Sequence, residues 1–339
     1  MMNSRQEGNR SLEYIISTIN IQQFTDLTSR GESPQSRCDR AEVAATALGR
    51  YGGDINILTE GFGGGAIGGV FPACTGGVVD KIRGFTRTDQ VGRVCDASSG
   101  TPAWDSVTGK CRTNFLTING GVIILVRDSM ASITSRHQLI FRNFHKGTYD
   151  RYSNKGAALV ECSDLGTQQK FFVVGTHLQA DEGDVNIEET HRTRVKQLKE
   201  IKSWVASKVG ESPDAPIIIA GDMNVEYYCT DPEDGHAPRI DLGKSPKIDE
   251  ANAALGGVID PVENIHRFSY DCLRNSRARN EAGAGFEKYQ NVLDYIGYMG
   301  ADGQGITPSI ETEVVYYDDT GLDDPIPTDH QLVRATVTL

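Results

Sequence analysis

The chain has 339 residues, of which 38% are hydrophobic and 24% are charged, and these values are typical of globular proteins. This length allows one large α/β domain or two smaller ones with a sizeable core. The net charge of −12 argues against a surface for duplex nucleic acid, which needs clustered Lys and Arg, but it does not exclude a local basic groove.

The sequence contains no segment that would direct the chain to a membrane or anchor it there. No apolar stretch approaches the ~18 residues that a spanning helix needs. Residues 1–10 are polar and are expected to be disordered, and the apolar run that follows them is too short for a signal peptide. We therefore expect a soluble protein, or a mature form whose leader is absent.

The cysteines form no recognisable metal motif. Their spacing contains no close Cys-x-x-Cys pair or Cys/His cluster, so a zinc site is not expected. Cys95 and Cys111 bracket a loop rich in Gly, Ser and Pro and could pair in an oxidising compartment, whereas mostly reduced, buried cysteines are an equally good interpretation. The seven cysteines are Cys38, Cys74, Cys95, Cys111, Cys162, Cys229 and Cys272.

Hydrophobic periodicity predicts alternating strands and helices along the chain. The Ile-rich residues 12–21 predict a strand, and the Ala-rich residues 39–48 predict a helix. Residues 187–209 predict a long helix with one apolar face. There is no repeat or long linker, so we expect one α/β domain over residues 1–339. Further strands are predicted at 55–58, 122–126, 157–161, 171–176, 217–221, 292–298 and 332–339.

Several predicted strands end in residues that can carry chemistry. One strand ends in His177, and another ends in Asp222, which Asn224 follows closely. Asp329 and His330 directly precede the last apolar run. Strand ends that present His, Asp and Asn towards one cleft are typical of metal-assisted phosphoester hydrolysis.

Oxygen ligands and imidazoles together indicate a magnesium-dependent hydrolase. His177 and His330 could act as general acid and general base, and Asp294 could hold one imidazole in the required tautomer. Seen alone, a carboxylate that closes a strand is more often a cap or turn residue, but so many such residues are hard to explain in this way. Mg²⁺ prefers oxygen ligands. Those expected at the C-terminal ends of separate strands are Glu60, Asp222, Asn224 and Asp329.

Short motifs recur at these strand ends from about residue 12 to the C-terminus. They are Asn20, Leu58-Thr59-Glu60, Gly175-Thr176-His177-Leu178-Gln179, Gly221-Asp222-Met223-Asn224, Leu293-Asp294-Tyr295 and Thr328-Asp329-His330, with Asn154-Lys155-Gly156 and Ser269-Tyr270-Asp271 between them. In these motifs the chain resembles the endonuclease/exonuclease/phosphatase superfamily. Within it, the chain is most similar to the neutral sphingomyelinases of the bacterial sphingomyelinase C type.

The resemblance implies both a fold and an activity. The fold would be a four-layer α/β/β/α sandwich of two packed mixed β-sheets flanked by helices, as in DNase I-like proteins. The activity would be hydrolysis of sphingomyelin to ceramide and phosphocholine, with Mg²⁺ or another divalent cation such as Mn²⁺ or Co²⁺ as cofactor. Glu60 would hold the principal ion with help from Asn20. The implied metal-binding residues are Asn20, Glu60, Asp222, Asn224, Asp329 and His330.

The resemblance also assigns roles in catalysis and substrate binding. His330 would be the general base that activates water, oriented by Asp294. His177 would donate a hydrogen bond or a proton to the phosphate or the leaving oxygen. Lys155, paired with Asp150, would reach the substrate phosphate. The implied catalytic residues are thus His177, Asp222, Asn224, Asp294 and His330, and the implied substrate-binding residues are Asp150, Lys155 and Asp271.

One departure from the bacterial pattern concerns the membrane. Bacterial members carry a Trp-bearing β-hairpin shortly before the final Asp-His, and this hairpin enters the bilayer. The corresponding residues 313–317 contain no Trp, and anionic headgroups would repel the aspartates of the acidic loop 318–327. Peripheral membrane contact is therefore expected to be weakened. The resemblance suggests secretion, although the sequence itself leaves the location open, and we expect a monomer.

Three other interpretations are less favoured. Residues 63–68 match the GxGxxG dinucleotide fingerprint, but Pro72 would break the helix that must follow it. A DNase I-like or abasic-site endonuclease would share Asp222 and His330, but the acidic charge and the sphingomyelinase-like setting of Lys155 count against it. A catalytically idle lipid- or partner-binding protein is disfavoured because every expected polar site residue is present.

Overall fold

The computed structural model describes most of the chain. The described residues are 12–23, 34–62, 78–95, 104–112, 117–182, 185–209, 215–259, 267–300, 307–317 and 327–339. Residues 1–10, the glycine-rich segment 63–68 and all but the last residue of the acidic loop 318–327 lie outside them. Among the described residues, no helix is both long enough and apolar enough to cross a membrane.

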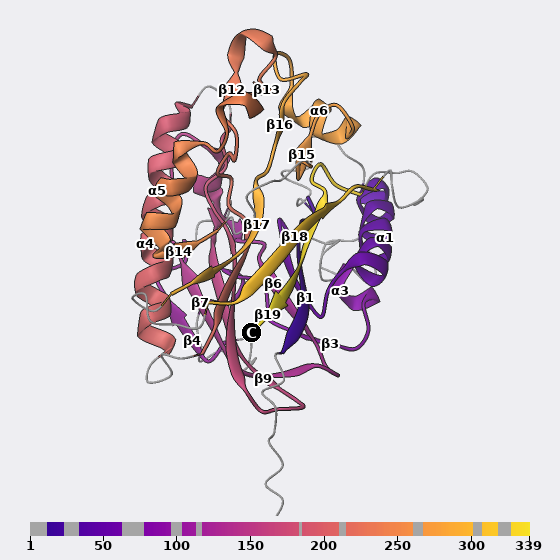
Figure 1. Cartoon of the computed structure of the whole chain (residues 1–339), viewed down its shortest axis with the longest axis vertical. Coiled ribbons are helices and arrows are strands. Elements are labelled where there is room, and N and C mark those ends of the chain that lie inside the picture. Colours follow the sequence, from indigo (N-terminus) through magenta and orange to yellow (C-terminus); the bar gives the residue numbers. More distant parts are fainter. Residues whose placement is uncertain are drawn as a thin grey trace, which may run out of the picture.

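Two mixed β-sheets form the centre of the molecule (Figure 1). Most neighbouring strands are antiparallel, but β1 and β2 pair in parallel, as do β10 and β11, and β4 and β7. The first sheet has the order β18 (Ser309–Val315), β19 (Leu332–Thr338), β1 (Glu13–Asn20), β2 (Ile55–Thr59), β6 (Ile123–Arg127) and β3 (Phe85–Arg87). The second has the order β14 (Gly257–Val258), β17 (Asp294–Met299), β11 (Ile217–Asp222), β10 (Lys170–His177), β9 (Gly156–Asp164), β7 (Ala131–Ile140) and β4 (Ser106–Thr108).

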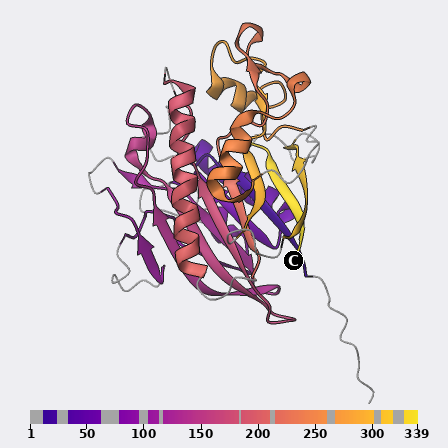
Figure 2. The ribbon, with the colours of Figure 1, turned by 60° about the vertical axis from the view of Figure 1, so that its left-hand side comes forward.

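Helices cover the outer face of each sheet, which gives four layers in the order α/β/β/α (Figures 1 and 2). The first sheet carries α1 (Pro34–Tyr51) and α3 (Val78–Lys81), and the second carries α4 (Ile187–Val209) and α5 (Pro246–Leu255). The predicted four-layer sandwich is thereby confirmed. The other described elements are α6 (Ser276–Ala282), the 3-10 turns η1 (Tyr149–Tyr152), η2 (Pro232–Asp234) and η3 (Ile240–Leu242), and the ribbons β5/β8 (Ile118–Asn119, Ser153–Asn154), β12/β13 (Thr230–Asp231, Ala237–Pro238) and β15/β16 (Tyr270–Asp271, Gln290–Asn291).

Aliphatic side chains fill the space between the two sheets. Ile57 and Ile124 of the first sheet belong to the same buried cluster as Val173 and Ile218 of the second. Because the central strands are covered on both faces, their sequences are apolar without alternation, as in β11. Burial between the layers therefore requires continuous runs of Ile and Val in these strands. The close packing of the two sheets also fixes the positions of the strand ends relative to one another.

The cysteines divide into paired and unpaired groups. A disulfide joins Cys95 to Cys111, as the intervening loop suggested. Cys38 is also disulfide-bonded. Cys162, Cys229 and Cys272 are free thiols. The interpretation that most of the cysteines stay reduced therefore does not hold for Cys38, Cys95 and Cys111.

Candidate active site

The parallel strand pairs bring four of the predicted residues to one edge. Asn20 ends β1, and Glu60 directly follows its parallel neighbour β2. In the second sheet, His177 ends β10 and Asp222 ends β11, and the strand register places these two residues side by side. Because parallel neighbours end at the same edge, the sheet topology alone gathers these polar side chains.

Three more predicted residues reach this edge from strands that run the opposite way. Asp294 begins β17, which is antiparallel to β11 and pairs Asp294 with Asp222. Asp329 and His330 precede β19, which is antiparallel to β1. The prediction that Asp329 lies at the C-terminal end of a strand is therefore wrong, since an antiparallel neighbour brings its N-terminal start to that edge.

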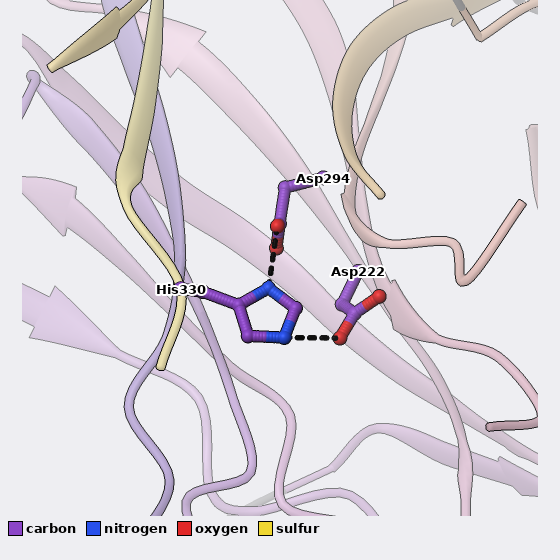
Figure 3. A group of neighbouring side chains, drawn as sticks. All are labelled: Asp222, Asp294 and His330. Atoms are coloured by element: carbon purple, nitrogen blue, oxygen red, sulfur yellow. Dashed lines mark hydrogen bonds and ion pairs between the residues drawn. The ribbon is translucent and has the colours of Figure 1, made fainter. Parts of the chain in front are cut away.

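His330 lies between two carboxylates (Figure 3). Its Nδ1 is 2.6 Å from Oδ2 of Asp294, and its Nε2 is 3.8 Å from Oδ2 of Asp222. The Ser269 hydroxyl accepts a hydrogen bond from the backbone N–H of Asp294 at 3.1 Å, and the Tyr270 ring packs edge-on against the imidazole with centroids 5.0 Å apart. These contacts hold the imidazole with Nε2 towards Asp222.

Lys155 is buried and contacts both Asp150 and His177. Its ammonium lies 2.7 Å from Oδ1 of Asp150 and donates to the Leu178 carbonyl at 3.0 Å. It also lies 3.1 Å from Nε2 of His177. An ammonium has donors only, so Nε2 of His177 is the acceptor in this arrangement. Asp150 and Lys155 thus pair as the sequence analysis expected.

Asp222 is the centre of the oxygen cluster. Its Oδ2 accepts a hydrogen bond from the Asn20 amide, and its Oδ1 accepts one from the backbone N–H of Asn224, both at 3.0 Å. Nε2 of His177 lies 3.7 Å from Oδ2 of Asp222 and 3.9 Å from Oε1 of Glu60. Residues from β1, β2, β10 and β11 therefore meet within a few ångströms.

Comparison with known proteins gives relatives in sequence, although no family model matches the chain. The chain is 30% identical to the sphingomyelinase C of Listeria ivanovii over 190 residues, which cover 56% of this chain and 50% of the relative. It is 27% identical to the sphingomyelinase C of Bacillus cereus over 225 residues, which cover 66% and 59%. The matched segments thus span less than two thirds of either relative.

Solved structures with the same architecture cover nearly the whole chain. Beta toxin from Staphylococcus aureus has a TM-score of 0.70 at 20% identity, with 95% of this chain and 99% of the toxin covered. Sphingomyelinase C from Streptomyces griseocarneus has a TM-score of 0.68 at 20% identity, covering 96% and 99%. A family protein of the endonuclease/exonuclease/phosphatase type from Bacteroides thetaiotaomicron has a TM-score of 0.55 at 14% identity, covering 97% and 98%.

The chain has the endonuclease/exonuclease/phosphatase fold. The predicted fold class is confirmed, as is the predicted resemblance to the bacterial sphingomyelinases. One of the similar solved structures is a beta toxin variant from Staphylococcus aureus with bound magnesium ions, at a TM-score of 0.68 and 19% identity over 96% of this chain and 99% of that one.

Two of the residues at this edge of the endonuclease/exonuclease/phosphatase fold have a strained backbone. Glu60 and Asn224 have φ values of 53° and 51°, in the left-handed region that costs non-glycine residues free energy. Gly221, just before Asp222, has a φ of 146°, and a Cβ there would lie 1.9 Å from the Thr176 carbonyl oxygen. Only glycine therefore lets β11 approach β10 at this point.

Crowding of carboxylates disfavours their charged forms. Burial and repulsion from Asp329 raise the pKa of Glu60 to about 8. Burial and repulsion from Asp294 raise the pKa of Asp222 to about 6. A hard divalent cation among these oxygens would remove the repulsion, so the donor set fits such an ion. Ligand atoms of Asp222, Asp294 and His330 also lie within 4.8 Å of one another.

The pKa values of the two imidazoles are shifted in opposite directions. Burial alone would lower the pKa of His330, but Asp294 and Asp222 hold it well above its ordinary value. Burial and the neighbouring Lys155 hold the pKa of His177 well below its ordinary value. His177 is therefore neutral in this arrangement, whereas the protonation of His330 depends on the charge of the surrounding carboxylates.

Two buried side chains that the sequence analysis did not single out hold the segment that carries Asp329. The Asn275 amide donates to the carbonyl oxygens of Thr328 and Asp329, each at 3.0 Å. Arg40 donates to the Pro327 carbonyl at 2.9 Å. One signal was present for Arg40, because it lies one turn before Ala44 on the apolar face of the predicted helix.

The Asp271 side chain accepts hydrogen bonds that stabilise its own loop. Its Oδ1 accepts hydrogen bonds from the backbone N–H groups of Leu273 at 2.9 Å and Arg274 at 3.1 Å, and from the Gln290 side chain at 2.8 Å. These bonds fix the turn that brings its neighbour Tyr270 to the His330 ring. Substrate binding by Asp271 stays a prediction.

Proposed function

We propose that the chain is a single catalytic domain that hydrolyses sphingomyelin to ceramide and phosphocholine. The observation that carries the proposal is the position of His330 between Asp294 and Asp222, at the strand edge that also carries Lys155. A base, crowded oxygen ligands and a cationic donor are what phosphodiester hydrolysis requires. The two sphingomyelinase C relatives support the substrate class.

The proposed cofactor is a divalent cation, with Mg²⁺ as the first candidate. Glu60 would be its principal ligand, and the neighbouring oxygens of Asn20, Asp222, Asn224 and Asp329 would complete or orient its shell. The raised pKa values of Glu60 and Asp222 support this choice, because they show that the nearby positive side chains do not balance the negative charge of the carboxylates. When bound, the ion would neutralise charge that develops on the phosphoryl oxygens.

The residues around the phosphodiester would divide proton transfer and charge stabilisation between them. Nε2 of His330 would take a proton from the attacking water, while Oδ2 of Asp294 holds the opposite N–H and so keeps the imidazole in the productive tautomer. Neutralising the charge of Asp222 and its neighbours would lower the pKa of His330 towards a value suited to a base.

Lys155 would stabilise the phosphate directly. Its ammonium is held by Asp150 and can donate to a phosphoryl oxygen. The donation proposed for His177 requires Lys155 to turn towards the phosphate and Nε2 to take up a proton, because Nε2 now accepts from the ammonium and carries no hydrogen.

Product analysis with and without metal tests this function. Incubation with sphingomyelin liposomes and Mg²⁺ is expected to release phosphocholine. EDTA should abolish the release and excess Mg²⁺ restore it, because the oxygen cluster needs an ion to bind an anionic phosphodiester. Phosphatidylcholine, lysophospholipids and plasmid DNA serve as parallel substrates. Chelator-resistant release would contradict the cation, and DNA nicking without phosphocholine release would replace the proposal with the endonuclease alternative.

We also propose a lipid contact beside the site. Tyr149 and Leu273 are large apolar side chains that are 68% and 52% exposed. Tyr149 directly precedes Asp150, and Leu273 lies in the loop whose Asn275 bonds to Asp329. Both side chains are thus carried by segments that supply the site, where a bilayer substrate would have to approach.

Paired substitutions test this contact. The double variant Tyr149→Ser/Leu273→Ser is expected to hydrolyse vesicle substrate about tenfold more slowly, since two exposed apolar side chains could no longer insert into the lipid. Dispersed short-chain substrate should be hydrolysed at the unchanged rate. Leu165→Ser is the matched control, because Leu165 is 47% exposed in the β9–β10 turn, at the far end of β10 from His177. Equal losses on both substrates, or none, would exclude the contact.

A further inference from the structure

A basic cavity lies at the edge of the seven-stranded sheet, apart from the cluster around Asp222. It has a volume of about 440 Å³. One wall is the segment that follows β4, with Gly109, Lys110 and Arg112, and the other is the segment that follows β7, with Phe141, Arg142 and Phe144. The acidic chain therefore gathers three cationic side chains around one cavity.

The guanidinium of Arg112 lacks partners for most of its donors. It lies over the Phe144 ring, 4.1 Å from the centroid. Its Nε and Nη1 are buried and have no hydrogen-bond partner among the described residues, and Nη2 reaches only the Asp150 carbonyl at 3.5 Å. A buried cationic group with unused donors is costly unless something accepts from it.

The nearby carboxylates are engaged elsewhere. Oδ1 of Asp150 is paired with Lys155, and its Oδ2 accepts from the backbone N–H of Ala180 at 2.9 Å. Both carboxylate oxygens of Glu200 are also used, because they accept from the backbone N–H groups of Arg142 and Asn143, each at 3.0 Å. Neither carboxylate therefore satisfies the donors of Arg112.

We infer that this cavity binds a phosphate-bearing anion. The guanidinium of Arg112 keeps unused donors on Nε and Nη1 that an anion could satisfy, and Lys110 and Arg142 at the exposed rim add positive charge. Phe141 and Phe144 supply an apolar wall for the group that carries the phosphate. The anion could be a lipid headgroup or a free phosphate compound, and both share this chemistry.

The cavity adjoins the proposed active site without sharing its side chains. The backbone N–H of Arg112 donates to the Asn154 side chain at 2.9 Å, and that of Phe141 donates to the Lys155 carbonyl at 3.0 Å. The Lys155 side chain itself points to His177. Occupancy of the cavity would thus stiffen the backbone that carries Lys155, but binding there does not depend on the proposed hydrolysis.

Binding of inorganic phosphate to the whole chain tests the inference. Calorimetric titration in EDTA limits binding at the acidic Asp222 cluster, whose charge repels phosphate without a cation. The wild type is expected to bind saturably, and Lys110→Gln/Arg142→Gln at least about tenfold more weakly, because two charges that face the anion are lost. Arg112→Gln should show the same loss. The rim variant alters only exposed side chains, so it remains informative if Arg112→Gln fails to fold.

The matched control removes the same charge elsewhere. Arg50→Gln/Arg83→Gln changes two exposed arginines near α1 and α3, on the other side of the molecule, and should bind phosphate like the wild type (Figure 1). Co-sedimentation with phosphatidylcholine vesicles, with and without phosphatidylglycerol, separates the two sources. Selective loss of anionic-vesicle binding in the rim variant identifies a lipid headgroup, and loss of phosphate binding alone identifies a free anion. Equal behaviour of the rim and control variants in both assays would overturn the inference.

Discussion

Replacement of His330 by Ala is expected to lower kcat for phosphocholine release by at least about 10³-fold, the range that loss of a general base produces. The reason is geometric, because no other described side chain both carries a free imidazole nitrogen beside Asp222 and is held from behind by a carboxylate. Steady-state kinetics at saturating Mg²⁺ measures the effect. Thermal unfolding should show that the variant still folds.

A second buried histidine provides the matched control. His191 is 2% exposed on α4, and its Nε2 lies 3.2 Å from Glu250, so it resembles His330 in burial and in having a carboxylate partner. His191→Ala should leave kcat close to that of the wild type. Asp294→Asn should fall between the two, because the imidazole keeps its position but loses the negative charge that stabilises its protonated form, and the amide can also hold the wrong tautomer. Comparable losses in His191→Ala and His330→Ala would mean that the effect is structural.

The fold could be predicted wherever packing imposes a regular pattern. Helix α4 was predicted with its observed bounds, because its amphipathic face runs without interruption over 23 residues. Strand β7 (Ala131–Ile140) was not predicted, since its burial alternates irregularly and its pairing with β9 shifts between Ile133 and Ser135. Helix α5 was missed because ten residues starting at a proline give too short an apolar face.

The residues of the candidate site that lie in motifs could be predicted, but the residues that hold those motifs in place could not. Asp222 and His177 could be found because each closes an apolar strand, and parallel pairing then brings them together. The antiparallel pairing of β19 with β1 could not be read from the sequence, although Asp329 and His330 visibly precede the apolar run that forms β19. Asn275 acts on backbone carbonyls, which leave no mark in the sequence.

The acceptor role of His177 could not be predicted from the sequence either. A histidine at a strand end can donate or accept, and the choice depends on which atom faces Nε2. Here the Lys155 ammonium faces it, from a residue 22 positions away in sequence. The strained φ values of Glu60 and Asn224 were equally invisible, because neither residue type requires the left-handed region.

Replacement of Glu60 by Gln is expected to change activity and stability in opposite directions. Burial and the nearby Asp329 raise the pKa of Glu60 to about 8, so above that pH its charged form is held at a free-energy cost. The amide has the same shape without the charge, and it leaves the backbone at φ 53° unchanged. Without divalent cation, we expect the melting temperature of Glu60→Gln above pH 8 to exceed that of the wild type by about one to two degrees, which corresponds to roughly 1 kcal/mol in the free energy of unfolding.

Addition of Mg²⁺ should reverse that order. An ion that binds only the folded wild type raises its melting temperature, whereas Glu60→Gln lacks the principal anionic ligand and should respond little while losing most phosphocholine release. Glu311→Gln, on the exposed face of β18, removes the same charge and should behave like the wild type in both assays. A Glu60→Gln protein that melts lower than the wild type without cation, or that gains as much from Mg²⁺, would show that this carboxylate stabilises the fold rather than binding the ion. The paired measurement separates the two roles. If Glu60 stabilises the fold, the variant melts below the wild type both with and without Mg²⁺. If Glu60 binds the ion, the variant melts above the wild type without Mg²⁺ and below it with Mg²⁺.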